Sequence, residues 1–187
     1  VMRGVEYLSS TPKYNLMYDA FGWERPTYIH LSPIMKDAQR KLSKRYGDAN
    51  FEDFVAKGYL PEAIVNYIAL LGWCPKTNKE KMTIEEMIEE FDVDGISKSP
   101  AIFDEAKMRW LNGEYLKAMT PDEFYKVSLP YILKSKADGK FNDYEISRLM
   151  QTRVDVLSDI PEKIDFLVDF DEYDVNMYVH QKMKVDF

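Results

Sequence analysis

From residue 50 onward, residues that start and stop helices divide the chain at regular intervals, and this pattern most constrains its fold. Capping residues or proline stand at most of the expected helix starts, and glycine follows several of the ends. Between them, apolar residues recur at the spacing of one helix face. The helices expected from this pattern cover residues 51–57, 61–71, 83–91, 103–112 (stopped by Gly113), a helix from 121, 142–157, and a last one from 161.

The first 50 residues predict a mixture of helix and strand. Thr11 and Pro12 mark the start of a helix that Gly22 ends, and residues 27–31 are rich in strand-forming types between two prolines. The predicted fold class is therefore mainly α, a helical bundle that follows a small α/β corner.

Several single residues have a simple structural interpretation. Trp73 and Trp110 stand among apolar residues at helical spacing, so we expect both in the core rather than stacked on nucleobases. His30 lies in the strand-like run, where a structural role is expected. Cys74, the single cysteine, is expected to be buried or half-buried.

Bulk properties exclude several classes of protein. The chain has 187 residues, of which 45% are hydrophobic and 30% charged, as in a globular protein with one core or two small ones. No apolar run approaches the roughly 20 residues that cross a bilayer, so no membrane association is expected. One cysteine and two histidines exclude an internal disulfide and predict no metal site. A cytoplasmic location fits.

One segment stands out by its charge. Residues 36–45, the basic segment, carry five positive charges and one negative charge, whereas the whole chain has a net charge of −7. Lys and Arg donate to phosphate oxygens, Ser43 adds a hydroxyl, and the nearby Gly47 allows a tight turn. These residues favour a phosphate-binding loop. The alternative is a solvated charged loop, which describes most charge runs.

Four ordered motifs resemble one family. Residues 41–45, Lys-Leu-Ser-Lys-Arg, resemble the second signature of class I aminoacyl-tRNA synthetases in the form used by glutamyl-tRNA synthetases. Residues 2–12 are similar to the amino-acid-site segment of that family. The Gly-Tyr-Leu-Pro-Glu-Ala helix at 58–73 and the Phe-Asp…Trp-Leu-Asn-Gly stretch at 103–116 also resemble the family. Coincidence is a poor explanation for four motifs in order.

The resemblance implies roles for the basic segment. In the family this loop stabilises the transition state in which a carboxylate attacks the α-phosphate of ATP and pyrophosphate leaves. Lys44 matches the second lysine of the signature and is the main candidate, with Lys41 and Ser43 as further catalytic candidates that order the loop. Lys44 and Arg45 are the candidate ATP ligands.

The resemblance also implies a site for the amino acid. Arg3 is the candidate ligand of the substrate carboxylate, because a guanidinium fork binds a carboxylate through two fixed bonds. The alternative is that Arg3 pairs with Glu6. Tyr7 is a second candidate for substrate binding, although the family commonly has histidine at its position.

What the sequence lacks suggests a piece of a longer enzyme. His30 and His180 are the two histidines, and neither lies in the His-x-Gly-His signature that class I synthetases also need. We therefore expect this chain alone not to form glutamyl adenylate. The expected division is a catalytic-domain remnant at 1–35, a KMSKS-like loop with a helical stem-contact region at 36–117, and the first part of an anticodon-binding bundle at 118–187. The corner at 1–35 is expected to be poorly ordered or repacked without its sheet neighbours.

The implied partners are tRNA(Glu), ATP with Mg²⁺, and L-glutamate, bound by a monomer. Residues 159–174 carry seven acidic side chains and one lysine, so phosphates should avoid them, with a weak basic cluster at Lys76, Lys79 and Lys81 as a second option. A stand-alone tRNA-binding module without catalysis is the alternative function. Enzymes that glutamylate a tRNA nucleoside resemble the N-terminal part alone, and residues 118–187 argue against them.

Overall fold

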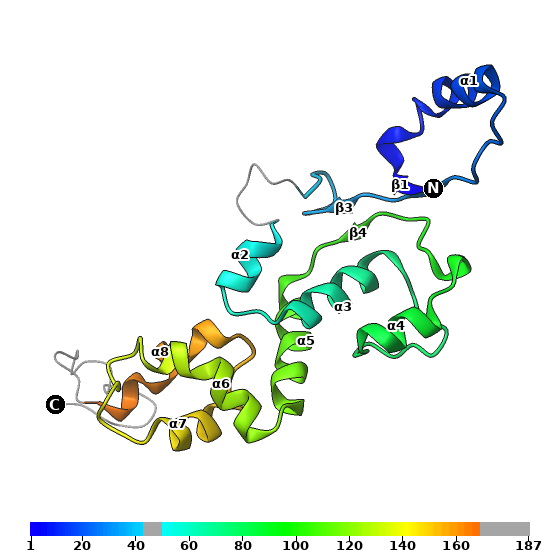
Figure 1. Ribbon diagram of the computed structural model, residues 1–187. Helices are drawn as coiled ribbons and strands as arrows, with labels where there is room; N and C mark the ends of the chain where they lie inside the picture. Colours follow the sequence, from blue (N-terminus) through cyan, green and yellow to red (C-terminus); the bar gives the residue numbers. More distant parts are fainter. Residues whose placement is uncertain (43–49, 169–187) are drawn as a thin grey trace, which may run out of the picture.

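The computed structural model describes residues 1–42 and 50–168 and is mainly helical (Figure 1). A small corner that contains α1 lies at one end of an elongated molecule, and the bundle of α6, α7 and α8 lies at the other. The helices are α1 (Thr11–Phe21), α2 (Phe51–Ala56), α3 (Pro61–Gly72), α4 (Ile84–Glu90), α5 (Glu105–Ala118), α6 (Pro121–Ile132), α7 (Asp143–Met150) and α8 (Ile160–Ile164). Short 3₁₀ turns are η1 (Val5–Tyr7), η3 (Val93–Gly95), η4 (Leu157–Asp159) and η5 (Asp165–Leu167).

The strands form two parallel pairs. β1 (Met2–Gly4) pairs with β2 (Ile29–Leu31), and β3 (Ile34–Met35) pairs with β4 (Ala101–Ile102). The prediction of a repacked corner is wrong for the described residues, because β1 and β2 keep the parallel pairing of an α/β domain. No side chain of residues 1–42 is buried, so this corner contributes strands but no core.

The helix starts follow the sequence signals closely. Thr83 and Thr120 each accept a hydrogen bond from the backbone N–H three residues on, and Glu86 and Glu123 close capping boxes with them. Gly22 ends α1 in a left-handed conformation, with φ of 65°. The local signals thus fix where these helices begin and end.

Two large apolar clusters form the core. One lies among α6, α7 and α8 in the C-terminal bundle, and the other lies among α2, α3 and α5. A smaller cluster joins Trp73 to Met82 and Met87 beneath α4. The half-buried ring of Tyr115 on α5 packs against both large clusters and therefore links them.

Two expected helix ends are wrong. α5 continues past Gly113 to Ala118, because this glycine is buried against another segment rather than ending a helix: a Cβ there would lie 2.4 Å from Asp155 Oδ1. The helix expected at 142–157 ends as α7 at Met150. Val154 and Leu157, which lie within the expected helix, are nevertheless buried, since the chain turns after α7 and crosses α5.

A buried amide fixes this crossing. Asn112 on α5 is fully buried; its Nδ2 donates to the carbonyl of Asp155 at 2.6 Å, and its Oδ1 accepts from the backbone N–H of Leu60 at 2.8 Å. The backbone N–H of Leu157 donates to the carbonyl of Gly58 at 3.2 Å. We call this contact of three segments the Asn112 junction. It joins the end of α2, the start of α3 and the 154–158 segment to α5.

The two tryptophans that were expected in the core differ in burial. Trp73 is 5% exposed, as predicted, whereas Trp110 is 43% exposed and the core prediction is wrong for it. The inward face of α5 carries Met108, Leu111 and Leu116, and Trp110 lies off that stripe. Cys74 is exposed, contrary to expectation.

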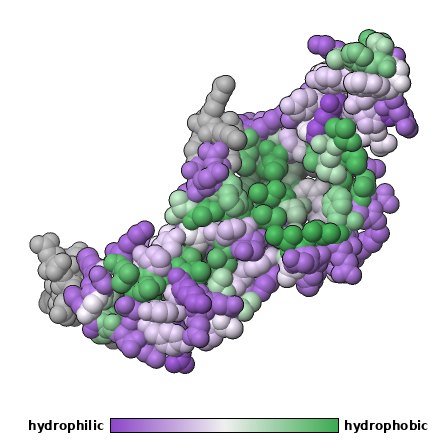
Figure 2. Space-filling model, in the orientation of Figure 1, coloured by the Kyte–Doolittle hydropathy of each residue, from purple (hydrophilic) through white to green (hydrophobic). Residues whose placement is uncertain are grey.

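Exposed apolar side chains gather where the molecule is hollowed, between the α1 corner and the helices α3 and α4 (Figure 2). Met2, Ile68 and Phe91 line a cavity of about 210 Å³ there and remain about half exposed. None of the helices in the described part of the chain has the length and apolarity that a membrane crossing requires.

The Asn112 junction predicts an unequal effect of two alanine substitutions. Gly58 has φ of 91°, and a Cβ would lie 2.9 Å from both Leu157 Cβ and Ser158 N. Gly139 has φ of 68° with nothing within 4 Å of its Cβ position. We expect Gly139→Ala to lower the free energy of unfolding by about 1–2 kcal/mol through backbone strain, and Gly58→Ala by about 1–3 kcal/mol more through overpacking.

Thermal and urea unfolding of both variants measure this difference. Equal losses in the two variants would show that the close approach of Gly58 to the 157–158 backbone does not constrain the fold.

Candidate functional site

Arg3 lies at the centre of a group of tyrosine rings in the N-terminal corner. Its guanidinium carbon is 4.8 Å from the ring centroid of Tyr28, 5.3 Å from that of Tyr14 and 5.5 Å from that of Tyr7. We call these three rings the tyrosine cage. Ring faces attract the cation and limit its movement, so they hold the guanidinium without neutralising its charge.

Hydrogen bonds also orient Arg3. Its Nη2 donates to Thr11 Oγ1 at 2.7 Å, and its Nε donates to His30 Nε2 at 3.4 Å. The Thr11 hydroxyl in turn donates to the carbonyl of Tyr7 at 2.9 Å. The structural role expected for His30 agrees with this contact, since it joins β2 to β1.

Arg3 has no acidic partner among the described residues. No described carboxylate lies within 4.0 Å of its guanidinium, so the alternative pairing with Glu6 is not seen there. A positive charge that is half-buried, oriented and unpaired at the start of α1 suits an incoming anion.

The described part of the basic segment forms a turn on β3. The backbone N–H of Lys36 donates to the carbonyl of Arg40 at 2.8 Å, and that of Leu42 donates to Ile34 at 3.0 Å. Lys41 thereby lies opposite Met35 in an antiparallel bridge. Ser43, Lys44 and Arg45, the other predicted residues of this loop, lie outside the described residues.

Asp37 closes this turn. Its Oδ1 accepts from the backbone N–H groups of Gln39 and Arg40, and its Oδ2 pairs with the Arg40 guanidinium at 2.6 Å. The hydrogen bond from Arg40 is the main cause that lowers the pKa of Asp37 to about 2, with the backbone bond from Gln39 next. The one negative charge of the basic segment, on Asp37, is therefore paired with Arg40 inside the turn.

The turn is also connected to distant parts of the chain. β3 pairs with β4, and the backbone N–H of Phe103 donates to the carbonyl of Met35 at 2.8 Å. Phe103 leads directly into α5. Two of the motifs found in the sequence, the basic segment and the stretch that begins at 103, are thus adjacent in space.

Two of the three lysines of the second basic cluster pair with carboxylates, and the third is held against the protein. Lys76 pairs with Asp92, and Lys79 pairs with Glu86. Lys81 donates to the carbonyl of Glu114 at 2.9 Å and lies over the ring of Tyr115. The expectation of a phosphate site here loses its support, because carboxylates already compensate the two lysines that extend into solvent.

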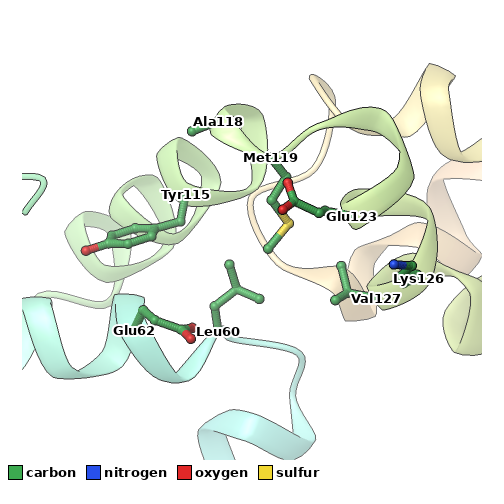
Figure 3. A pocket seen from close by; sticks show the side chains of 8 residues that line it. All are labelled: Leu60, Glu62, Tyr115, Ala118, Met119, Glu123, Lys126 and Val127. Carbon is green, nitrogen blue, oxygen red and sulfur yellow. The ribbon is translucent and has the colours of Figure 1, made fainter. Parts of the chain in front are cut away.

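A groove of about 430 Å³ lies where α3, α5 and α6 meet (Figure 3). Leu60, Met119 and Val127 lie between Tyr115 on one side and Lys126 on the other. The groove has two carboxylates, Glu62 and Glu123, against one lysine, so it does not favour a phosphate. Burial raises the pKa of Tyr115 to about 12, and its hydroxyl donates to the carbonyl of Met82.

Sequence reasoning missed most of the surroundings of Arg3. Tyr14 and Tyr28 come from α1 and from the residue before β2, and no local pattern relates them to Arg3. Their positions result from the parallel pairing of β1 with β2, in which Arg3 lies opposite His30.

Comparison with known proteins identifies the family. The model of the catalytic domain of class I tRNA synthetases of the E and Q type matches residues 1–110. The chain belongs to this class I tRNA synthetase family. A model of an anticodon-binding domain matches residues 101–186 of this synthetase chain. The family resemblance predicted from the four motifs is confirmed.

Curated relatives of this synthetase chain are glutamate–tRNA ligases. The protein of Clostridium novyi is 53% identical over 189 residues, covering 100% of this chain and 39% of that protein. The protein of Clostridium botulinum strain Eklund 17B is 56% identical over 187 residues, covering 98% of this chain and 38% of that protein. The chain thus spans about two fifths of the length of these relatives.

Solved structures agree on the fold. The glutamate–tRNA synthetase of Elizabethkingia anophelis superposes with a TM-score of 0.82 at 32% identity, covering 94% of this chain and 40% of that one. A glutamate–tRNA ligase of Elizabethkingia meningosepticum, solved in complex with its amino acid, superposes with a TM-score of 0.80 at 29% identity. The match covers 98% of this chain and 41% of that one. The mainly α fold class predicted for this synthetase chain is confirmed.

The Asp37 turn predicts a pKa that responds to one neighbour. The folded-state pKa of Asp37 lies below its ordinary value, so its stabilising effect is present above about pH 4 and is lost as the pH falls towards 2. Arg40→Gln should raise this pKa while leaving it below the ordinary value, because the backbone donors remain. Carboxyl-carbon NMR titration measures it.

Arg25→Gln is the matched control, since Arg25 pairs with Asp19 in another part of the corner. An Asp37 pKa that shifts equally in both variants would contradict the local origin of the effect.

Proposed function

We propose that this chain is part of a glutamate–tRNA ligase, which activates glutamate with ATP to glutamyl adenylate and transfers it to the 3′ end of tRNA(Glu). One observation carries the proposal: relatives that bear this name are 53–56% identical over nearly the whole chain. The geometry at Arg3 and at the basic segment supports the assignment of individual roles.

Arg3 is proposed to bind a carboxylate of glutamate. The tyrosine cage and Thr11 hold the guanidinium in one orientation, so little side-chain entropy is lost when the substrate arrives. Tyr7, about half exposed, forms one wall of the cage and would contact the substrate beside Arg3. An unpaired guanidinium also avoids the cost of breaking an existing ion pair.

The basic segment is proposed to stabilise the departing pyrophosphate. Lys44 supplies the main positive charge, Lys41 and Ser43 order the loop, and Arg45 with Lys44 binds ATP. The fixed turn of residues 36–42 supports this proposal, because it holds Lys41 against β3 at the entrance to the loop. Positive charge near the leaving phosphates lowers the barrier without covalent chemistry by the protein.

Class I synthetases in general use ATP together with Mg²⁺. Within residues 1–42 and 50–168, no three His, Cys, Asp or Glu side chains are grouped so as to hold a metal ion. The described residues do not fit a resident metal, and Mg²⁺ enters the proposal only as the companion of ATP.

The proposed division of labour follows the chain. Residues 1–35 supply the amino-acid end of the catalytic domain, residues 36–117 contact the tRNA stem, and residues 118–187 begin the anticodon-binding part. The anticodon-binding match to residues 101–186 supports the last of these. A monomer in the cytoplasm remains our proposal.

The 187-residue chain is expected to catalyse no ATP–pyrophosphate exchange with glutamate. Its sequence contains no His-x-Gly-His signature, so the half of the ATP site that this signature provides is missing. Exchange of labelled pyrophosphate into ATP, with the Clostridium botulinum ligase as positive control, measures this. Glutamate-dependent exchange by the chain alone would contradict the prediction.

The chain is also expected to bind tRNA(Glu) through phosphate contacts. In a salt titration, Lys44→Ala should reduce the slope of log affinity against log salt by about 1. Lys76→Ala, which removes a lysine paired with Asp92, is the matched control and should change the slope less.

An unrelated tRNA separates the two functions considered. Preference for tRNA(Glu) without exchange activity would favour a part that recognises tRNA by shape. Equal, weak binding of both RNAs would contradict recognition by the helical region of this chain.

A further inference from the structure

His30 on β2 lies beside the groups that orient Arg3. Its ring is half-buried, and the parallel pairing of β1 with β2 places it opposite Arg3. His30 Nε2 accepts from Arg3 Nε at 3.4 Å and lies 3.4 Å from Thr11 Oγ1. The ring also stacks with that of Tyr28, with 6.2 Å between the centroids. One ring nitrogen therefore contacts both the proposed carboxylate ligand and the threonine that holds it.

The protons available at this contact decide which form of the ring fits. The Thr11 hydroxyl has one proton, which it donates to the carbonyl of Tyr7, and its oxygen accepts from Arg3 Nη2. The Arg3 Nε–H group therefore needs a lone pair from another side chain. His30 Nε2 has that lone pair only when the ring is neutral and carries its proton on Nδ1. The hydrogen bond thus selects one charge state and one tautomer of His30.

A protonated ring would not fit the same contact. His30 Nε2 would then carry a proton that faces the Arg3 Nε–H group, and two cations would meet. Within residues 1–42 and 50–168, no ion pair joins either of them to a carboxylate. The Glu6 carboxylate lies against Gly4 instead. The other titratable side chains around the pair belong to the tyrosine cage, whose rings are uncharged in their phenol form. Arg3 therefore has to move when His30 becomes charged.

We propose that His30 is a positioning residue for glutamate binding. In its neutral form it holds Arg3 at the carboxylate site, and gaining a proton releases Arg3. This inference rests on the proposed function and deepens it, because it adds a condition on the charge of one ring to the role of Arg3. Histidine ordinarily changes charge between about pH 5 and 8. The affinity for glutamate is full while His30 is neutral and falls by roughly 2- to 10-fold on protonation, the range for one lost hydrogen bond.

NMR of the 187-residue chain tests the contact without any ligand. Exchange of the Arg3 Nε–H proton with water is followed against pH, together with the ring protons of His30. Arg25 Nε, which donates to Asp19 Oδ1 at 2.7 Å, is the internal reference that removes the intrinsic pH dependence of exchange. Relative to Arg25, exchange at Arg3 should become several-fold faster as His30 is protonated, and the two curves should share one midpoint.

Two substitutions separate positioning from a merely structural role. His30→Gln supplies an amide oxygen that accepts a hydrogen bond but does not titrate, so Arg3 should stay held at every pH from about 5 to 8. His30→Leu removes the acceptor and should release Arg3 over the whole range. His180→Gln removes the other histidine of the chain; as the matched control, it should leave the pH dependence at Arg3 unchanged.

Titration with L-glutamate on the same signals links the contact to the substrate. The affinity should fall at low pH in the unmodified chain and stay constant in His30→Gln. No response of Arg3 to glutamate at any pH overturns the proposed role of Arg3 itself, and this inference with it.

A response to glutamate that ignores the charge of His30 overturns the role of His30 alone. The same conclusion follows from an affinity that rises as His30 gains its proton, or from Nε–H exchange without the shared midpoint. If His30→Leu does not keep the corner folded, the curves of the unmodified chain and of His30→Gln decide between these outcomes.

Discussion

The helical part of the structure depends on the buried side-chain amide of Asn112. Its two ends bond backbone groups that lie far apart in the sequence, in Leu60 and Asp155. A buried amide or peptide group without a partner costs several kcal/mol of folding free energy. The three segments of the Asn112 junction therefore have to be packed together for any of these groups to be buried. Gly113, next in sequence, provides the space for that approach. The ion pair between Arg109 and Asp159 joins the same elements on the more exposed side. The C-terminal bundle is therefore fixed to α5 by polar contacts as well as by apolar packing.

The sequence predicted those features that are decided locally. The helix caps at Thr83 and Thr120 belong to these features, because each threonine and its glutamate lie three residues apart on the chain. The length of α5 could not be predicted from local signals. Glycine is typical of a helix end, whereas Gly113 is needed for the close approach of Asp155, 42 residues further along the chain. The burial of Trp110 was also mispredicted for this reason. Its apolar neighbours in the sequence suggested the core, but the segments that contact α5 at Asn112 determine which face of the helix is buried.

The candidate site likewise has a part that the sequence predicted and a part that depends on tertiary contacts. Arg3 was found because its motif is contiguous, whereas the tyrosine cage depends on β1 meeting β2 and on the position of α1. The guanidinium and the three rings come from β1, η1, α1 and the residue before β2, so no short stretch of sequence contains this contact. The roles of Lys44, Ser43 and Arg45 stay predictions, because these residues lie outside those that the structure describes.

The pairing of β3 with β4 has a consequence for the order of folding. The turn of residues 36–42 lies on β3, whose partner strand β4 follows three intervening helices, α2, α3 and α4. Contacts between residues so distant in sequence form late, because the entropy of closing the intervening loop has to be lost first. During synthesis, a ribosome would release the basic segment well before its strand partner. Until residue 102 emerges, β3 lacks the strand that joins it to the start of α5, so the turn of residues 36–42 reaches its final position only after most of the helical region has been made.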